Sequence, residues 1–264
     1  MKKYFYIFKN SLSEYFAYRL NFFLWRLRVI ITVLINFFLW QAIFQSNKNV
    51  FGYQEPQILT YMILITLIES VVLSTQTQKV AYEINSGALS RLLIVPINFF
   101  TFNFIRDLSD KTINTICAMI EIPFLLIILK PPVYIQTNFL WLILFVFTLI
   151  FAAIIYFEIN MILSFIGFWS KETWAPRFIF YILLMFLAGN YFPLDILPHP
   201  LYQIFLLMPF SYLVFFPLKI YLGNLTFSFV FNGLVVALLW IFLLWYFMYF
   251  LWNRGLKVYT AEGI

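Results

Sequence analysis

Long apolar segments separated by short polar ones make up most of the chain, and this pattern predicts membrane-spanning helices. A helix needs about 20 mostly apolar residues to cross a hydrocarbon core about 30 Å thick. The predicted spans cover residues 22–44, 58–74, 112–129, 140–169, 178–189 and 227–252. The first is marginal in its apolar length, the fourth must tilt or project, and the fifth is short. We therefore predict an all-α integral membrane protein with six transmembrane helices in a single domain, residues 1–264.

Residues 1–20 have a different pattern, which predicts an amphipathic helix. Apolar and polar positions fall on opposite faces at helical spacing. The apolar face contains Tyr4, Phe5, Phe8, Leu12, Tyr15 and Phe16. Such a helix lies at the membrane interface and does not cross the bilayer.

Residues 201–222 are apolar enough to be a seventh span, but three observations argue against it. Pro209 and Pro217 interrupt the segment, and Lys219 would cost roughly 2.5–3.5 kcal/mol near the bilayer centre. A seventh crossing would also put the last basic residues outside. We expect a re-entrant outer hairpin over 189–222 instead.

The distribution of basic residues predicts the orientation. With six spans, only Lys48, Lys130 and Lys219 of the 17 lysines and arginines lie on the outer side. Positive charge is retained in the cytoplasm, so both termini are expected there. We expect Arg26 and Arg28, near the start of the first span, to reach the cytoplasmic headgroups.

Composition agrees with a membrane protein: 64% of the residues are hydrophobic and 11% are charged, against about 25% charged in soluble domains. The net charge of +6 is expected from cytoplasmic loops and does not indicate nucleic-acid binding. The start MKKYFYIFKN lacks a cleavage site, so we expect no removable signal peptide.

Recognisable catalytic motifs are missing from the sequence. It contains no phosphate-binding glycine loop and no zinc motif, and Cys117 and His199 are its only cysteine and histidine. Neither a disulfide within the chain nor a thiolate metal cluster can form. We expect no cofactor and no metal in this chain.

Four stretches resemble the membrane subunit of a type 2 ATP-binding-cassette (ABC-2) exporter with six spans. They are the N-terminal amphipathic segment, YEINSGALSRLLIVPIN, GNYFPLDILPHPLYQIFLLMPFSY and WNRGLKVYTAEG. The second is similar to the family's cytoplasmic signature of a glycine, a leucine pair and a proline. The last is similar to its C-terminal R-x-G-L-x-x-Y-x-x-x-G.

For residues 77–98, the resemblance implies a coupling helix that docks on a separate ATPase. The expected coupling residues are Glu83, Ile84, Gly87, Leu89, Arg91, Leu92, Leu93 and Pro96. The apolar ones, with Val80, offer contacts to the partner, and Glu83 and Arg91 can form ion pairs with it. Gly87 permits a sharp turn and Pro96 ends the helix. The alternative is a helix lying on the headgroups without a partner.

Three acidic residues within the predicted spans are candidates for a translocation path: Glu69, Glu121 and Glu158. Ionisable groups at this depth are expensive and suggest function. The alternative is a structural role, through pairing with neighbouring helices. After the fifth span, Gly189, Phe192, Pro193 and Pro209 are candidates for an outer gate, and a plug that holds the spans together is the alternative.

The expected function is that of an export permease in the cytoplasmic membrane. Its expected partners are two copies of a separate ATPase, which bind ATP and Mg²⁺, a second permease, identical or homologous, and membrane lipids. By the resemblance, the path lies between the first, second and fifth spans of two permeases. Two alternatives are a membrane-embedded lipid-linked transferase using Glu121 or Glu158, and an anchor or sensor without transport.

Overall fold

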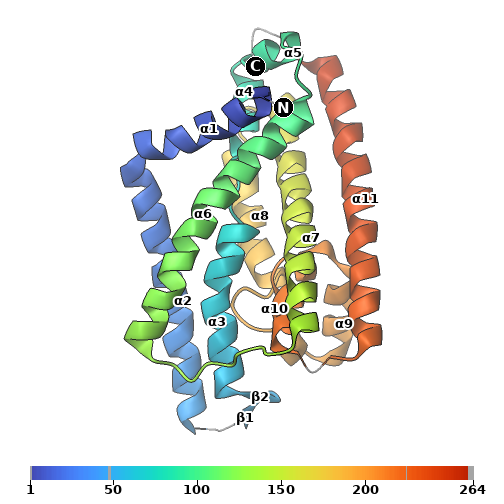
Figure 1. Cartoon of the computed structure of the whole chain (residues 1–264). Helices are drawn as coiled ribbons and strands as arrows, with labels where there is room; N and C mark the ends of the chain where they lie inside the picture. The colour runs from blue at the N-terminus through green and yellow to red at the C-terminus, as the bar shows by residue number, and fades with distance from the viewer. Residues whose placement is uncertain (1, 47–48, 224, 261–264) are drawn as a thin grey trace.

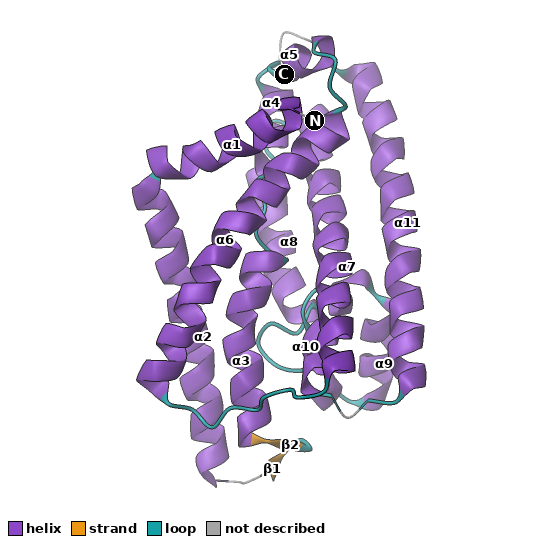
Figure 2. Ribbon diagram, in the orientation of Figure 1, coloured by secondary structure: helices purple, strands orange, loops and turns teal. Residues whose placement is uncertain are grey.

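Four long helices form the frame of the protein. The computed structural model describes residues 2–46, 49–223 and 225–260. Within these residues, four helices are long and apolar enough to cross a membrane. They are α2 (Arg19–Ser46), α6 (Phe99–Leu129), α7 (Phe139–Ser164), which continues into the 3-10 helix η1 (Phe165–Phe168), and α11 (Phe227–Val258). The chain is almost wholly helical, and the helices run roughly side by side (Figure 2).

The second and fifth predicted spans form shorter helices. They are α3 (Glu55–Val71), with 17 residues, and α8 (Trp174–Leu187), with 14. At 1.5 Å per residue they are about 26 Å and 21 Å long, so neither helix alone matches the hydrocarbon core of about 30 Å. Beyond α3 the chain continues as irregular, mostly buried backbone over 72–77.

Both chain ends lie at one end of the bundle (Figure 1), beside α4 (Gln78–Asn85) and α5 (Leu89–Ile94). Helix α1 (Lys2–Ala17) lies across α6 at this end. A small antiparallel hairpin of β1 (Asn49–Val50) and β2 (Tyr53–Gln54) marks the opposite end. The N- and C-terminal regions therefore share one side of the bundle.

Between α8 and α11 the chain forms a set of short helices, which we call the outer segment. They are η2 (Leu194–Ile196), α9 (His199–Leu207), η3 (Pro209–Tyr212) and α10 (Phe215–Leu222). This segment lies toward the hairpin end (Figure 1). None of its helices approaches the length of a span, because prolines stand at or beside the start of several.

Two apolar clusters hold the helices together. The larger one joins α2, α3, α7, α8, α10 and α11. The second, which we call the aromatic end cluster, lies at the end with the termini and consists of Val80, Ile84, Leu89, Phe99, Phe157, Met161, Phe165, Phe168, Met248 and Trp252. Within it the rings of Phe99 and Trp252 stack with centroids 4.0 Å apart.

The structure corrects one expected boundary. The charged run RDLSDK, which we expected to precede the third span, lies inside α6, and the helix begins at Phe99, not near residue 112. Its charges fit inside a helix because they face other polar groups of the same bundle, as described below. Lys48, expected on the outer side, and tail residues 261–264 lie outside the described residues.

Candidate functional site

The predicted coupling region forms two short helices joined by a tight turn. Helices α4 and α5 meet at Gly87, whose φ of 74° is left-handed and favours glycine. The Tyr259 hydroxyl donates a hydrogen bond to the Gly87 carbonyl (2.7 Å) and accepts one from the Ser90 amide (3.0 Å). The turn is thereby fastened to the chain just after α11. We call residues 77–98 the α4–α5 segment.

The apolar face of this segment is used inside the chain. Val80, Ile84 and Leu89 are fully buried in the aromatic end cluster. The expectation that Ile84 and Leu89 contact a partner is therefore wrong for this structure. Their burial shows that the amphipathic pattern of α4 reflects packing within the bundle, where α4 contacts α7 and η1.

Glu83 is also engaged within the chain. Its carboxylate accepts a hydrogen bond of 2.8 Å from Arg106 of α6, and both side chains are largely buried. The predicted pairing of Glu83 with a partner is therefore not available in this arrangement. Nearby, a Cβ on Gly167 would lie 3.0 Å from the Ala81 carbonyl oxygen, so the missing side chain allows η1 to approach α4 closely.

A different set of side chains faces outward, and we call it the exposed edge. It contains Tyr82, Arg91, Leu93, Ile94, Val95 and Pro96. Ile94 is 84% exposed, the most exposed of the large hydrophobic residues. The expected coupling residues Arg91, Leu93 and Pro96 belong to this edge, and Leu92 is partly exposed. An apolar surface with one arginine therefore projects at the end that holds both termini.

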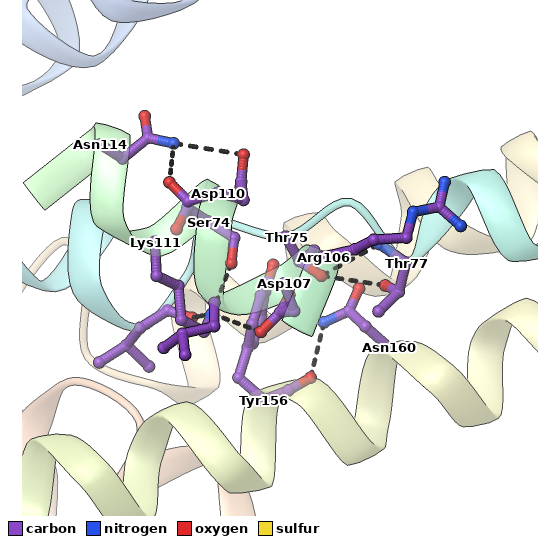
Figure 3. Close-up of polar contacts among 12 residues, drawn as sticks. Ser74, Thr75, Thr77, Arg106, Asp107, Asp110, Lys111, Asn114, Tyr156 and Asn160 are labelled. Carbon is purple, nitrogen blue, oxygen red and sulfur yellow. Dashed lines mark hydrogen bonds and ion pairs between the residues drawn. The ribbon is translucent and has the colours of Figure 1, made fainter. Parts of the chain in front are cut away.

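A buried polar cluster on α6 lies against the chain between α3 and α4 (Figure 3). The α6 polar cluster consists of Asn103, Arg106, Asp107, Ser109, Asp110, Lys111 and Asn114, all buried. Lys111 Nζ donates to the carbonyls of Val72 (2.9 Å) and Ser74 (2.6 Å) and lies 3.2 Å from Asp107 Oδ2. The ammonium of Lys111 thus binds both the end of α3 and the irregular backbone that follows it.

This contact matters because irregular backbone buried in a bundle must find its hydrogen bonds within the protein. The ammonium of Lys111 supplies donors to two carbonyls just beyond the C-terminal end of α3, those of Val72 and Ser74. Ser164 Oγ of α7 similarly donates to the Thr77 carbonyl (2.8 Å). On the other side, Tyr15 of α1 donates to Asp110. The cluster therefore joins α1, α3, α6 and α7 around residues 72–77.

The sequence contained a signal for this cluster that we did not use. Its members recur at spacings of three and four residues, which places them on one face of a helix. A polar stripe of this kind inside an apolar protein predicts a buried network more directly than a loop.

The three candidate path glutamates lie on three different helices, α3, α6 and α7. Glu121 forms an ion pair with Arg26 of α2, and Arg26 also donates to Ser70 (3.0 Å) and Asn114 (3.2 Å). The expectation that Arg26 reaches the headgroups is therefore wrong, because the side chain is buried between helices α2, α3 and α6. Glu69 lies partly exposed on α3, and Glu158 is buried on α7.

At the hairpin end, Tyr53, Asp195 and Lys219 form an outer triad. The Tyr53 hydroxyl donates to Asp195 (2.8 Å), and Lys219 Nζ donates to both Asp195 (2.6 Å) and the Tyr53 oxygen (2.6 Å). Burial raises the pKa of Tyr53 well above its ordinary value, so its hydroxyl keeps its proton and remains a donor. The triad ties β2 to η2 and α10.

The residues expected to form an outer gate lie between the end of α8 and the start of η3. Gly189 has a φ of 84°, and its carbonyl accepts a hydrogen bond of 2.6 Å from the Tyr61 hydroxyl of α3. Pro193 and Pro209 are buried and Phe192 is partly buried. These contacts place all four in packed surroundings, and they do not distinguish a gate from a plug.

Taken with its long apolar helices, the packing defines a multi-pass all-α membrane protein. The family model of the ABC-2 family transporter protein matches residues 30–263, which is most of the chain. The chain therefore belongs to the ABC-2 transporter family and is a transmembrane permease. A comparison with curated proteins gives no match. Helix α1 precedes the region that matches the family.

Proposed function

We propose that this chain is the permease subunit of an ATP-binding-cassette exporter and is driven by a separate ATPase. The observation that carries the proposal is the exposed edge: an apolar surface centred on Ile94, at the end of the bundle with both termini. Apolar side chains exposed together are costly in water and mark a binding surface. Family membership supports the same function.

The proposed topology has six crossings of the cytoplasmic (inner) membrane. Both termini lie in the cytoplasm. The four long helices cross fully, α3 crosses together with residues 72–77, and α8 crosses together with the start of the outer segment. The outer segment is then re-entrant. Two observations support this topology. Helices α8 and α10 are short, and the two chain ends lie at one end of the bundle (Figure 1).

The contacts of the α4–α5 segment suggest how work would reach the spans. A force that the ATPase applies to the exposed edge would be transmitted to α6 through the Glu83–Arg106 ion pair. It would be transmitted to α11 through the Gly87–Tyr259 hydrogen bond. The aromatic end cluster fills the space between these connections, so the segment moves with α6, α7 and α11 as one unit.

In the proposed assembly, two copies of the ATPase bind ATP and Mg²⁺, and a second permease, identical or homologous, completes the path. This chain provides no catalytic group for hydrolysis and binds lipid but no nucleic acid. Helices α2, α3 and α8 face the second permease. Large apolar side chains such as Ile35, Phe38 and Leu183 are exposed on α2 and α8, as a protein or lipid contact requires.

The outer triad is proposed to keep the outer gate closed at rest. Asp195 and Lys219 lie on the outer segment while Tyr53 lies on the hairpin before α3. Movement of α3 away from the outer segment must break these contacts, so they oppose opening until the ATPase closes.

Co-purification tests the proposed function. The chain is expressed with a candidate ATPase, and Ile94→Asp is compared with Phe51→Asp, which adds the same charge to an exposed apolar residue at the opposite end. We expect Ile94→Asp to lose the ATPase and Phe51→Asp to retain it. Equal recovery with both variants, or none with the unaltered chain, contradicts the proposal.

A further inference from the structure

A cleft of 760 Å³ lies between α6, α7 and α11, away from the helices proposed to face the second permease. Its walls are mostly aromatic and aliphatic. The lining includes Asn98, Thr101, Phe157, Glu158, Trp245 and Tyr249. The cleft is large enough for a drug-sized molecule, because ligand pockets commonly measure about 300–1,000 Å³.

Glu158 is the one ionisable carboxyl in this lining. It is 1% exposed, and neither of its carboxyl oxygens has a hydrogen-bond partner among the described residues. The acidic residues in the ion pairs of the described residues are Glu121, Glu14, Glu83, Asp107 and Asp195, and Glu158 is not among them. A buried carboxyl without a partner is expensive, particularly when ionised. By contrast, Glu121 on α6 has Arg26 beside it.

The rings around Glu158 are suited to a cation. Electron-rich faces of Trp, Tyr and Phe attract positive charge, by about 0.5–2 kcal/mol each. Trp245 is 49% and Tyr249 is 52% exposed, so the cleft is open along α11 to the surroundings of the bundle. Asn98 and Thr101, at the start of α6, lie at the end that holds both termini.

We propose that this cleft binds a hydrophobic organic cation, with the positive charge beside Glu158 and the apolar body among the rings. The ligand would arrive from the cytoplasmic leaflet as cargo for export. Its export rests on the proposed function, whereas its binding to the cleft does not. An apolar neutral molecule leaves the carboxyl unpaired, and an organic anion is repelled by it. A cation supplies an opposite charge for the carboxylate, which a neutral hydrogen-bond donor does not.

Binding of tetraphenylphosphonium to the purified full chain, without any ATPase, tests this proposal. The chain is placed in phosphatidylcholine nanodiscs, and tetraphenylborate, of similar size and shape but opposite charge, serves as the comparison. We expect saturable binding of the phosphonium that weakens at least about tenfold in Glu158→Gln, a change of about 1.4 kcal/mol. Tetraphenylborate should bind no more tightly to the unaltered chain than to Glu158→Gln.

Two further variants make the result specific. Trp245→Leu removes a ring but keeps an apolar wall, and we expect it to weaken phosphonium binding while Glu158 remains in place. Glu55→Gln removes an acid at the start of α3, at the opposite end of the bundle, and should leave binding unchanged. Each variant must elute as a folded species of unaltered size.

Several outcomes would overturn the proposal. They are equal phosphonium binding to the unaltered chain and Glu158→Gln, equal binding of phosphonium and borate, or displacement of the phosphonium by phosphatidylethanolamine, which would assign the cleft to a lipid amine. Because no ATPase is present, failure here leaves the permease function standing. Conversely, loss of ATPase co-purification leaves the binding result intact.

Discussion

Replacing Lys111 by methionine removes one ammonium on which three buried contacts depend. The side chain of methionine has a similar length but no donor, so the carbonyls of Val72 and Ser74 lose their partner and Asp107 loses its cation. Lys111 and Asp107 are 9% and 1% exposed, so water does not replace what is lost. We expect residues 72–77 to loosen.

The expected loss of unfolding free energy follows from these contacts. Breaking a buried ion pair on one side costs about 3–5 kcal/mol, because the remaining charge stays buried. Asp107→Asn should cost less, since Lys111 still serves both carbonyls. In Lys111→Met/Asp107→Asn no charge is left unpaired, so the double variant should be more stable than the sum of the single losses predicts, by about 1–3 kcal/mol.

Unfolding in mixed detergent and sodium dodecyl sulfate micelles, followed by circular dichroism, measures these differences. Lys130→Met is the control, because Lys130 is an exposed lysine just beyond the other end of α6. It should change stability by less than about 0.5 kcal/mol. A Lys111→Met variant as stable as this control, or strictly additive losses, would show that Lys111 does not hold residues 72–77 in place.

Three other changes have defined expected results. In Gly255→Ala the added Cβ would overlap the Phe168 ring, so we expect a loss of about 1–3 kcal/mol of unfolding free energy in the same assay. Tyr259→Phe removes both hydrogen bonds to the Gly87 turn and should lower the unfolding free energy by about 1–3 kcal/mol. The folded variant should also stimulate the ATPase less than the unaltered chain does. Asp195→Asn weakens the outer triad, and a thiol placed at residue 192 should then react faster with an impermeant maleimide.

Matched controls separate these effects from general damage. Asn253→Ala changes an exposed residue in the same turn of α11 as Gly255 and should leave stability unchanged. Gln203→Ala changes an exposed residue of α9 and should leave the labelling rate unchanged. If either control behaves like its paired variant, the specific contact is not the cause. The labelling variants carry Cys117→Ser, so the introduced thiol is the only one.

The apolar pattern was sufficient to predict the all-α membrane class and the cores of the long helices, because length and hydropathy set those directly. It was not sufficient for the first turns of α6. There the run of charges was expected to lie before the third span, whereas Lys111 and Asp107 lie inside α6 and pair with each other, and Lys111 also contacts residues after α3. Contacts between positions 39 residues apart have no local signature.

The coupling region shows a second limit. The sequence predicted a turn at Gly87 and a helix end at Pro96, and α5 ends at Ile94, just before that proline, since glycine and proline act locally. It did not show which side faces inward. An apolar position such as Ile84 has the same pattern whether it packs on its own bundle or on a partner, and only the fold assigns it to the aromatic end cluster.

The most direct test of the central claim is to photo-crosslink the exposed edge in living cells. A photoreactive amino acid is placed at residue 94 in one variant and at residue 51, on the hairpin at the opposite end, in the other. We predict an adduct between residue 94 and an ATP-binding-cassette ATPase, with none at residue 51. An adduct at 51, or no ATPase adduct at 94 when the exporter is active, would contradict it.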